Sequence, residues 1–134
     1  MIDDARVGVV EMLDMVGRTV WTFALTAWKG NQPPVCGTDG RVYVADEGWL
    51  KCIKDGAPEW LAEFEPAGNF WLTSTADGRV IALANKHLML FGDDGSVMFD
   101  VEITGEAEEF YAPPAIDRAG RIFVAGNKNL YCFE

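Results

Sequence analysis

The sequence of 134 residues has little of the material that several functions require. It contains one histidine and three cysteines, Cys36, Cys52 and Cys132, and no two cysteines are adjacent or have the Cys-x-x-Cys spacing. An odd cysteine count without such spacing argues against a disulfide framework or a redox motif and indicates a reducing, cytoplasmic location. Basic residues are also few, since 11 lysines and arginines stand against 21 acidic residues, for a net charge of −10. This balance disfavours direct nucleic-acid binding.

Long hydrophobic runs are absent too. The apolar stretches are interrupted by glycine, aspartate or lysine and stay well below the roughly 20 residues of a membrane span. Asp3 and Asp4 stand where a secretory signal carries positive charge. The composition is nevertheless globular, with 49% apolar and 24% charged residues. We therefore expect a soluble protein that does not enter membranes.

A repeated pattern organises the chain. A turn glycine, an arginine and a β-branched or aromatic run occur together at Gly40, Gly78 and Gly120, which lie 38 and 42 residues apart. Ten residues after each glycine, a second apolar run begins with leucine, at Leu50, Leu88 and Leu130. Self-similarity at this period is typical of repeat architectures.

Two further elements complete each unit. A large aromatic residue stands four positions after a turn glycine, which predicts an outer strand; the pairs are Gly17 with Trp21, Gly56 with Trp60 and Gly95 with Phe99. Apolar segments 33–36, 70–73 and 111–116 precede the Gly-Arg turns and predict a fourth strand. Four antiparallel strands in about 40 residues, joined by Asp-Gly turns, predict an all-β fold built from β-propeller blades.

Residues 115–125, Ala-Ile-Asp-Arg-Ala-Gly-Arg-Ile-Phe-Val-Ala, resemble the Ala-x-Asp-x-x-Gly-x-Ile/Val-Tyr-Ala core of the quinoprotein-like (PQQ-type) β-propeller repeat. The aromatic residue four positions after a turn glycine is similar to the docking tryptophan of that repeat. The resemblance covers residues 17–134; it departs from the pattern at 74–78 and at Phe99, which replaces the tryptophan. It implies inter-blade docking for Trp21, Trp60 and Phe99. No quinone cofactor is expected, because the adjacent cysteine pair of the resembled enzymes is missing.

With strands labelled A to D outward from the axis, the chain reads D, ABCD, ABCD, ABC. Three blades cannot close a ring, since ring propellers have about four to eight. We expect the N-terminal D strand, residues 19–25, to complete the last blade of a second copy, which makes a six-bladed homodimer. The alternative is a piece of a longer propeller. Residues 1–16 form a separate segment, strand or helix, ahead of the repeat domain at 17–134.

Residues with catalytic chemistry are few. His87 is predicted at an exposed hairpin, with no obvious carboxylate beside it in sequence. Asp93 and Asp94 precede Gly95 and Ser96 in a turn that lacks the ligand spacing of a calcium loop. We therefore expect neither an enzyme nor a metal site.

Five residues stand out as candidates for partner binding. Trp28 and Trp49 are tryptophans that the repeat does not explain, and Glu106, Glu108 and Glu109 form the densest acidic cluster. Exposed aromatics often anchor interfaces. The predicted function is a non-catalytic binding or assembly module that presents an acidic face to a basic protein. The alternative is an acidic nucleic-acid mimic, of the kind that phage-encoded inhibitors use, which blocks a basic nucleic-acid-binding protein.

Overall fold

The computed structural model describes residues 8–26, 33–46, 48–63, 70–84, 86–104 and 109–134. Over these ranges the chain is all-β, as the sequence predicted, and no described helix could cross a membrane. The strands are β1 (Val9–Leu13), β2 (Thr19–Ala24), β3 (Val35–Cys36), β4 (Val42–Asp46), β5 (Trp49–Lys54), β6 (Ala57–Glu63), β7 (Phe70–Ser74), β8 (Val80–Ala84), β9 (His87–Phe91), β10 (Val97–Glu102), β11 (Ala115–Ile116), β12 (Ile122–Ala125) and β13 (Leu130–Phe133).

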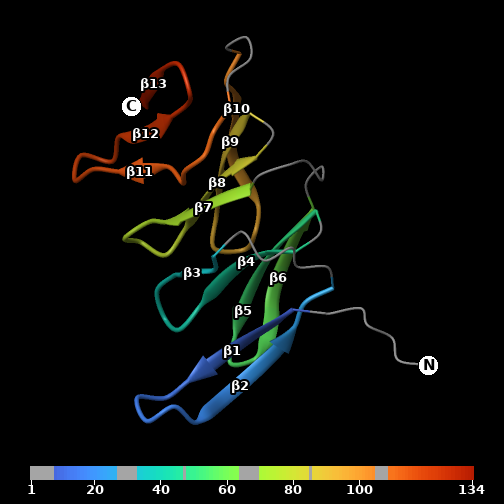
Figure 1. The fold of residues 1–134 in the computed structure, drawn as a ribbon. Helices are drawn as coiled ribbons and strands as arrows, with labels where there is room; N and C mark the ends of the chain where they lie inside the picture. The colour runs from blue at the N-terminus through green and yellow to red at the C-terminus, as the bar shows by residue number, and fades with distance from the viewer. Residues whose placement is uncertain (1–7, 27–32, 47, 64–69, 85, 105–108) are drawn as a thin grey trace.

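The strands form four antiparallel sheets that follow one another along the chain (Figure 1). The first sheet is β1–β2, the second β3–β4–β5–β6, the third β7–β8–β9–β10 and the fourth β11–β12–β13. Neighbours in each sheet are consecutive in sequence, so every sheet is a simple meander. The second and third sheets confirm the predicted repeat of four antiparallel strands.

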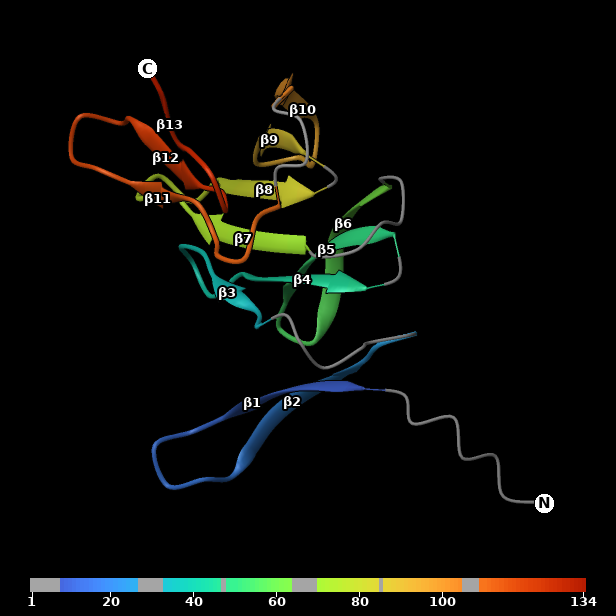
Figure 2. The same ribbon diagram turned by 45° about the horizontal axis from the view of Figure 1, so that its top comes forward.

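Each pair of consecutive sheets encloses its own apolar core. Strand β8 shows why, because its side chains alternate between two faces and all of them are buried. Val80, Ala82 and Ala84 pack in the core shared with the second sheet. Ile81 and Leu83 pack in the core shared with the fourth sheet. The sheets of one chain make an open stack, and the described residues close no ring (Figure 2).

The outer hairpins repeat one register, including a β-bulge at the same place. In each of them the aromatic residue pairs with a residue of the preceding strand, and the next pair skips one residue of the outer strand. The pairs are Met12 with Trp21, Cys52 with Trp60 and Leu90 with Phe99, and the skipped residues are Val20, Glu59 and Met98. Strands β2, β6 and β10 are therefore equivalent, and so are β1, β5 and β9.

Two predicted strands are shorter than expected. Segments 33–36 and 111–116 contribute only the two-residue strands β3 and β11. Prolines at 33–34 and 113–114 directly precede them, and a proline nitrogen cannot donate a ladder hydrogen bond. The pairing of these inner strands therefore begins only after the prolines.

The segment before Gly17 forms a strand where the structure describes it. Its hydrogen-bonding partner is β2, with Val9 opposite Ala24 and Glu11 opposite Thr22. Residues 9–13 therefore form a strand, and the helical alternative is wrong for them. Residues 1–7 lie outside the described residues.

Candidate functional site

Trp60 fills the space between the second and third sheets. Its ring centroid lies 5.8 Å from that of Tyr43 and 6.2 Å from that of Phe91, with which it stacks. Gly95, in the β9–β10 turn, lies against the indole, because a Cβ built on it would be 2.6 Å from Cε3 of Trp60. We call this arrangement of Tyr43, Trp60, Phe91 and Gly95 the closed wedge. It joins one sheet to the turn of the next.

The same contact occurs one sheet earlier, between Trp21 and Gly56. A Cβ on Gly56 would be 3.1 Å from Cβ of Trp21. Both glycines have a positive φ, and each precedes by four residues the aromatic residue of its own hairpin. Phe99 is the third aromatic of this series. No described turn glycine lies against it.

The packing in the closed wedge predicts that Gly95→Ala lowers the stability of the fold. The new methyl group meets the indole of Trp60 at a positive φ, so overpacking adds to backbone strain. We expect a loss of about 3 kcal/mol in the free energy of unfolding, measured by urea denaturation. Gly120→Ala is the matched control, because Gly120 has the same φ of 82° and open space at its Cβ. Strain alone should cost about 1 kcal/mol there, and equal losses in both variants would contradict the packing role.

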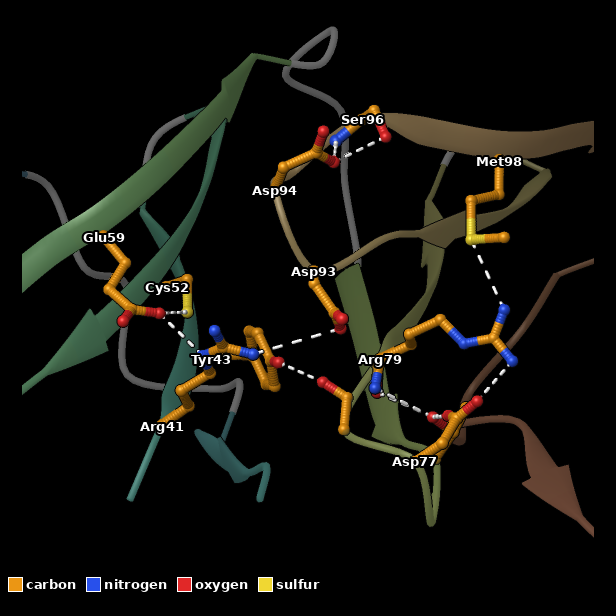
Figure 3. Close-up of polar contacts among 12 residues, drawn as sticks. Arg41, Tyr43, Cys52, Glu59, Asp77, Arg79, Asp93, Asp94, Ser96 and Met98 are labelled. Carbon is orange, nitrogen blue, oxygen red and sulfur yellow. Dashed lines mark hydrogen bonds and ion pairs between the residues drawn. The ribbon is translucent and has the colours of Figure 1, made fainter. Parts of the chain in front are cut away.

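A charged rim lies beside Tyr43 of the closed wedge and consists of Arg41, Glu59 and Asp93 (Figure 3). Nε of Arg41 donates to Oε2 of Glu59 at 2.6 Å, and its Nη1 lies 3.9 Å from Oδ1 of Asp93 in the next sheet. Glu59 is the residue skipped at the bulge, and a bulge turns a side chain away from the regular alternation. The hydroxyl of Tyr43 donates to the carbonyl of Gly78 at 2.5 Å. The contacts of Arg41 with Asp93 and of Tyr43 with Gly78 tie the second sheet to the third.

Cys52 lies beneath this rim and is fully buried. Burial, and then the nearby Glu59 carboxylate, raise the pKa of its thiol to about 12. A thiol with this pKa stays protonated at neutral pH and is a poor nucleophile. Its role is therefore packing.

Arg79 occupies in the third sheet the position that Arg41 has in the second (Figure 3). Met98 stands at the bulge position of Glu59, and Nη1 of Arg79 lies 3.4 Å from its sulfur. Arg79 also pairs with Asp77, whose pKa this hydrogen bond lowers to about 2. Its Nε is buried and has no hydrogen-bond partner in the described part of the chain. Arg41 is bridged to the next sheet, whereas the contacts of Arg79 with Asp77 and Met98 lie within its own sheet.

An apolar cavity of about 610 Å³ opens beside Arg79, between the third and fourth sheets. We call it the open groove. It is the counterpart of the closed wedge, because Phe99 and Phe133 stand where Trp60 and Phe91 stand one sheet earlier. Its apolar walls include Ile81, Leu90, Phe99, Ile116, Ile122 and Phe133.

One side of β13 is unpaired next to the open groove. Among the described strands β13 pairs only with β12, and its Leu130 is 69% exposed. Cys132 pairs with Phe123 as Cys52 pairs with Tyr43, yet Cys132 is exposed and Cys52 is buried. Two features that bury Cys52 are missing at Cys132 among the described residues: the third sheet packs on the face of Cys52, and Trp60 lies opposite it on β6. A fourth strand with a further sheet packed on it would cover Cys132 in the same way.

The predicted partner-binding residues are not gathered at this groove. Trp28, Glu106 and Glu108 lie outside the described residues. Trp49 begins β5 and is 37% exposed, and Glu109 accepts a hydrogen bond from the hydroxyl of Tyr111. Neither lines the open groove. Its signal in the sequence was instead Phe99, because the residue 35 positions later is Glu134, where Trp21 and Trp60 have the turn glycines Gly56 and Gly95.

The structure adds one contact to the catalytic candidates. Nδ1 of His87 lies 2.7 Å from Oδ1 of Asp100, a carboxylate that sequence proximity did not reveal because it lies on the neighbouring strand. Both side chains are about half exposed. Asp94 accepts hydrogen bonds from the backbone and hydroxyl of Ser96, as a turn aspartate does. In the described ranges, no three His, Cys, Asp or Glu residues are placed to hold a metal ion.

Comparisons with known proteins assign no family. No family model and no curated protein matches the sequence. Among solved structures, a protein of unknown function from Bacteroides caccae is similar, with 13% identity and a TM-score of 0.40. The match covers 89% of this chain and 62% of that protein, so the chain spans less than two thirds of its length.

Proposed function

We propose that this protein is a non-catalytic assembly module of propeller-type blades that binds a protein partner through the open groove and the free edge of β13. The observation that carries the proposal is the contrast between two equivalent spaces. An aromatic residue and a turn glycine fill the closed wedge, whereas the open groove is an apolar cavity of about 610 Å³ beside an unpaired strand. Exposed apolar surface next to a strand edge favours association.

The closed wedge defines what the open groove accepts. Strand β6 pairs with β5 along its length and lays Trp60 opposite Cys52. By the same geometry, a strand added to β13 lays a large apolar side chain opposite Cys132. That side chain lies on the face of the fourth sheet away from the open groove, whose lining includes Ile122 and Phe133 but not Cys132. The part of the added hairpin that enters the groove is its turn, which lies against Phe99 as the Gly95 turn lies against Trp60. Main-chain hydrogen bonds then supply affinity, and the fit of the turn in the groove supplies specificity.

The rest of the surface is acidic, and we propose that a basic protein is the further partner of the assembled module. The side chain of Asp93 is 71% exposed, and 21 acidic residues stand against 11 basic ones in the sequence. A nucleic-acid mimic has less support, because the turn carboxylates Asp14, Asp77 and Asp117 are each paired with an arginine of their own turn. Association with a basic partner should weaken with added salt.

A peptide copy of β6 tests the groove. We expect a peptide of residues 55–63 to bind the 134-residue protein with a Kd below about 1 mM and to shift the NMR signals of β13. A peptide with Gly56→Trp should bind at least about tenfold more weakly, because residue 56 takes the place of the turn glycine against Phe99, where a large side chain overpacks the groove.

Two valines of β10 give matched controls in the protein. Val101 lines the open groove and Val97 does not, although both are exposed. Val101→Glu should abolish peptide binding, and Val97→Glu should leave it unchanged. Unshifted β13 signals at millimolar peptide, or equal effects of the two valine variants, would refute the groove as the binding site.

A further inference from the structure

The first sheet contains a turn glycine that no aromatic residue contacts among the described residues. Gly17 has a φ of +85° and belongs to the series of Gly56 and Gly95, but nothing lies within 4 Å of a Cβ built on it. Gly56 lies against Trp21 and Gly95 lies against Trp60. Gly17 is therefore a turn glycine without an aromatic residue, and Phe99 is an aromatic residue without a turn glycine.

The tip of the turn that holds Gly17, between the paired Asp14 and Arg18, carries two exposed apolar residues. Met15 is fully exposed and Val16 is 73% exposed, whereas the equivalent residues of the third sheet are Asp93 and Asp94. Val20, the residue skipped at the bulge of β2, is 61% exposed. An apolar turn of this kind suits an apolar groove better than it suits water.

Strand β2 has the register needed to extend the fourth sheet. Its Trp21 lies opposite Met12 of β1 as Trp60 lies opposite Cys52 of β5. The equivalent of Met12 and Cys52 in the fourth sheet is Cys132 of β13. Strand β13 therefore matches β1 position by position, and β2 fits beside either of them.

We propose that β1 occupies the position beside β2 that β13 of a second copy of this chain takes in a dimer. In one copy β1 covers the inner edge of β2. In the dimer, β13 of the other copy displaces β1, pairs with β2 and lays Cys132 opposite Trp21. Gly17 of one copy then packs on Phe99 of the other, and two reciprocal exchanges relate the copies by a two-fold axis.

The position of Trp21 is compatible with this exchange. Trp21 packs on Gly56 of its own second sheet, and that contact does not involve β1. After exchange, β2 lies between the fourth sheet of one copy and the second sheet of its own, as β6 lies between its own β5 and the third sheet. The inference rests on the proposed function, since it names the occupant of the open groove.

The test measures mass and thiol exposure together, in a Cys36→Ser background that leaves Cys132 as the exposed thiol. Over about 1 to about 100 μM protein we expect the sedimentation mass to reach twice 14.8 kDa. Over the same range the labelling rate of Cys132 by a maleimide should fall at least about tenfold, because a strand comes to cover it.

A disulfide that locks β1 onto β2 separates exchange from other dimerisation. Glu11 and Thr22 lie directly opposite each other, at a spacing that a disulfide can bridge. The oxidised Glu11→Cys/Thr22→Cys variant should remain a monomer with reactive Cys132, and a reductant should restore the dimer. Thr22→Cys alone, treated identically, should still dimerise.

Three outcomes overturn the inference. They are a monomer at every concentration, a dimer whose Cys132 stays reactive, and a locked variant that still dimerises with Cys132 protected. If the chain remains a monomer but binds the 55–63 peptide at β13, the groove function stands and only the second copy as its occupant fails. If the peptide does not bind and the chain does not dimerise, the groove function fails as well.

Discussion

Replacing Trp60 with alanine is expected to lower the free energy of unfolding by about 3 kcal/mol, measured by urea denaturation. The indole stacks on Phe91, contacts Tyr43 and covers the Gly95 turn, so its removal leaves a cavity where the second and third sheets meet. The surrounding strands cannot collapse into that cavity, because each is held by its own ladder. The loss is a large part of the stability of a domain of this size.

Two controls identify the cause of this loss. The indole nitrogen of Trp60 is buried without a hydrogen-bond partner among the described residues, so Trp60→Phe keeps most of the packing and breaks no hydrogen bond. It should cost about 1 kcal/mol. Trp49→Ala, at a tryptophan that is 37% exposed, should cost less than about 1 kcal/mol. A Trp60→Ala loss as small as that of Trp49→Ala would contradict the role of the closed wedge.

Asp46→Ala should have an effect of similar size for an electrostatic reason. The Asp46 side chain is fully buried, and its Oδ2 accepts hydrogen bonds at 2.7 Å from Nζ of Lys51 and from the backbone nitrogen of Thr26. Lys51 is itself only 11% exposed, so the variant leaves an ammonium group without its carboxylate in an apolar setting. We expect a loss of about 3 kcal/mol in urea unfolding.

Removing both charges together distinguishes the ion pair from its surroundings. The double variant Asp46→Leu/Lys51→Met replaces the pair with apolar side chains of similar size. It should be more stable than Asp46→Ala by about 2 kcal/mol, because no unpaired charge remains in the interior. If the double variant is no more stable than Asp46→Ala, the unpaired ammonium is not the cause of the loss.

Several contacts could not be predicted from the sequence because their partners lie on different strands or in different sheets. Arg41 and Glu59 are 18 residues apart, and Asp93 belongs to the next sheet. The bulge that turns Glu59 toward Arg41 leaves no mark in composition. Asp46 carries no signal of its own in the sequence, because its role depends on the hydrogen bonds that it accepts from Thr26 and Lys51 in the folded chain.

The sequence by itself determined the strands, their order and the four-strand unit. Turn glycines with positive φ and alternating apolar residues act locally, so Gly40, Gly78 and Gly120 mark their hairpins without help from the rest of the chain. The proline-shortened strands β3 and β11 show the same local control.

Only the tertiary structure decided which wedges are filled. Trp21, Trp60 and Phe99 look alike in sequence, but two of them meet a turn glycine of the next sheet and the third borders an open groove. That difference is set by the stacking of whole sheets, because the glycine that receives each aromatic residue lies 35 positions away along the chain. The physical reason is that packing between sheets joins residues that local backbone preferences cannot bring together.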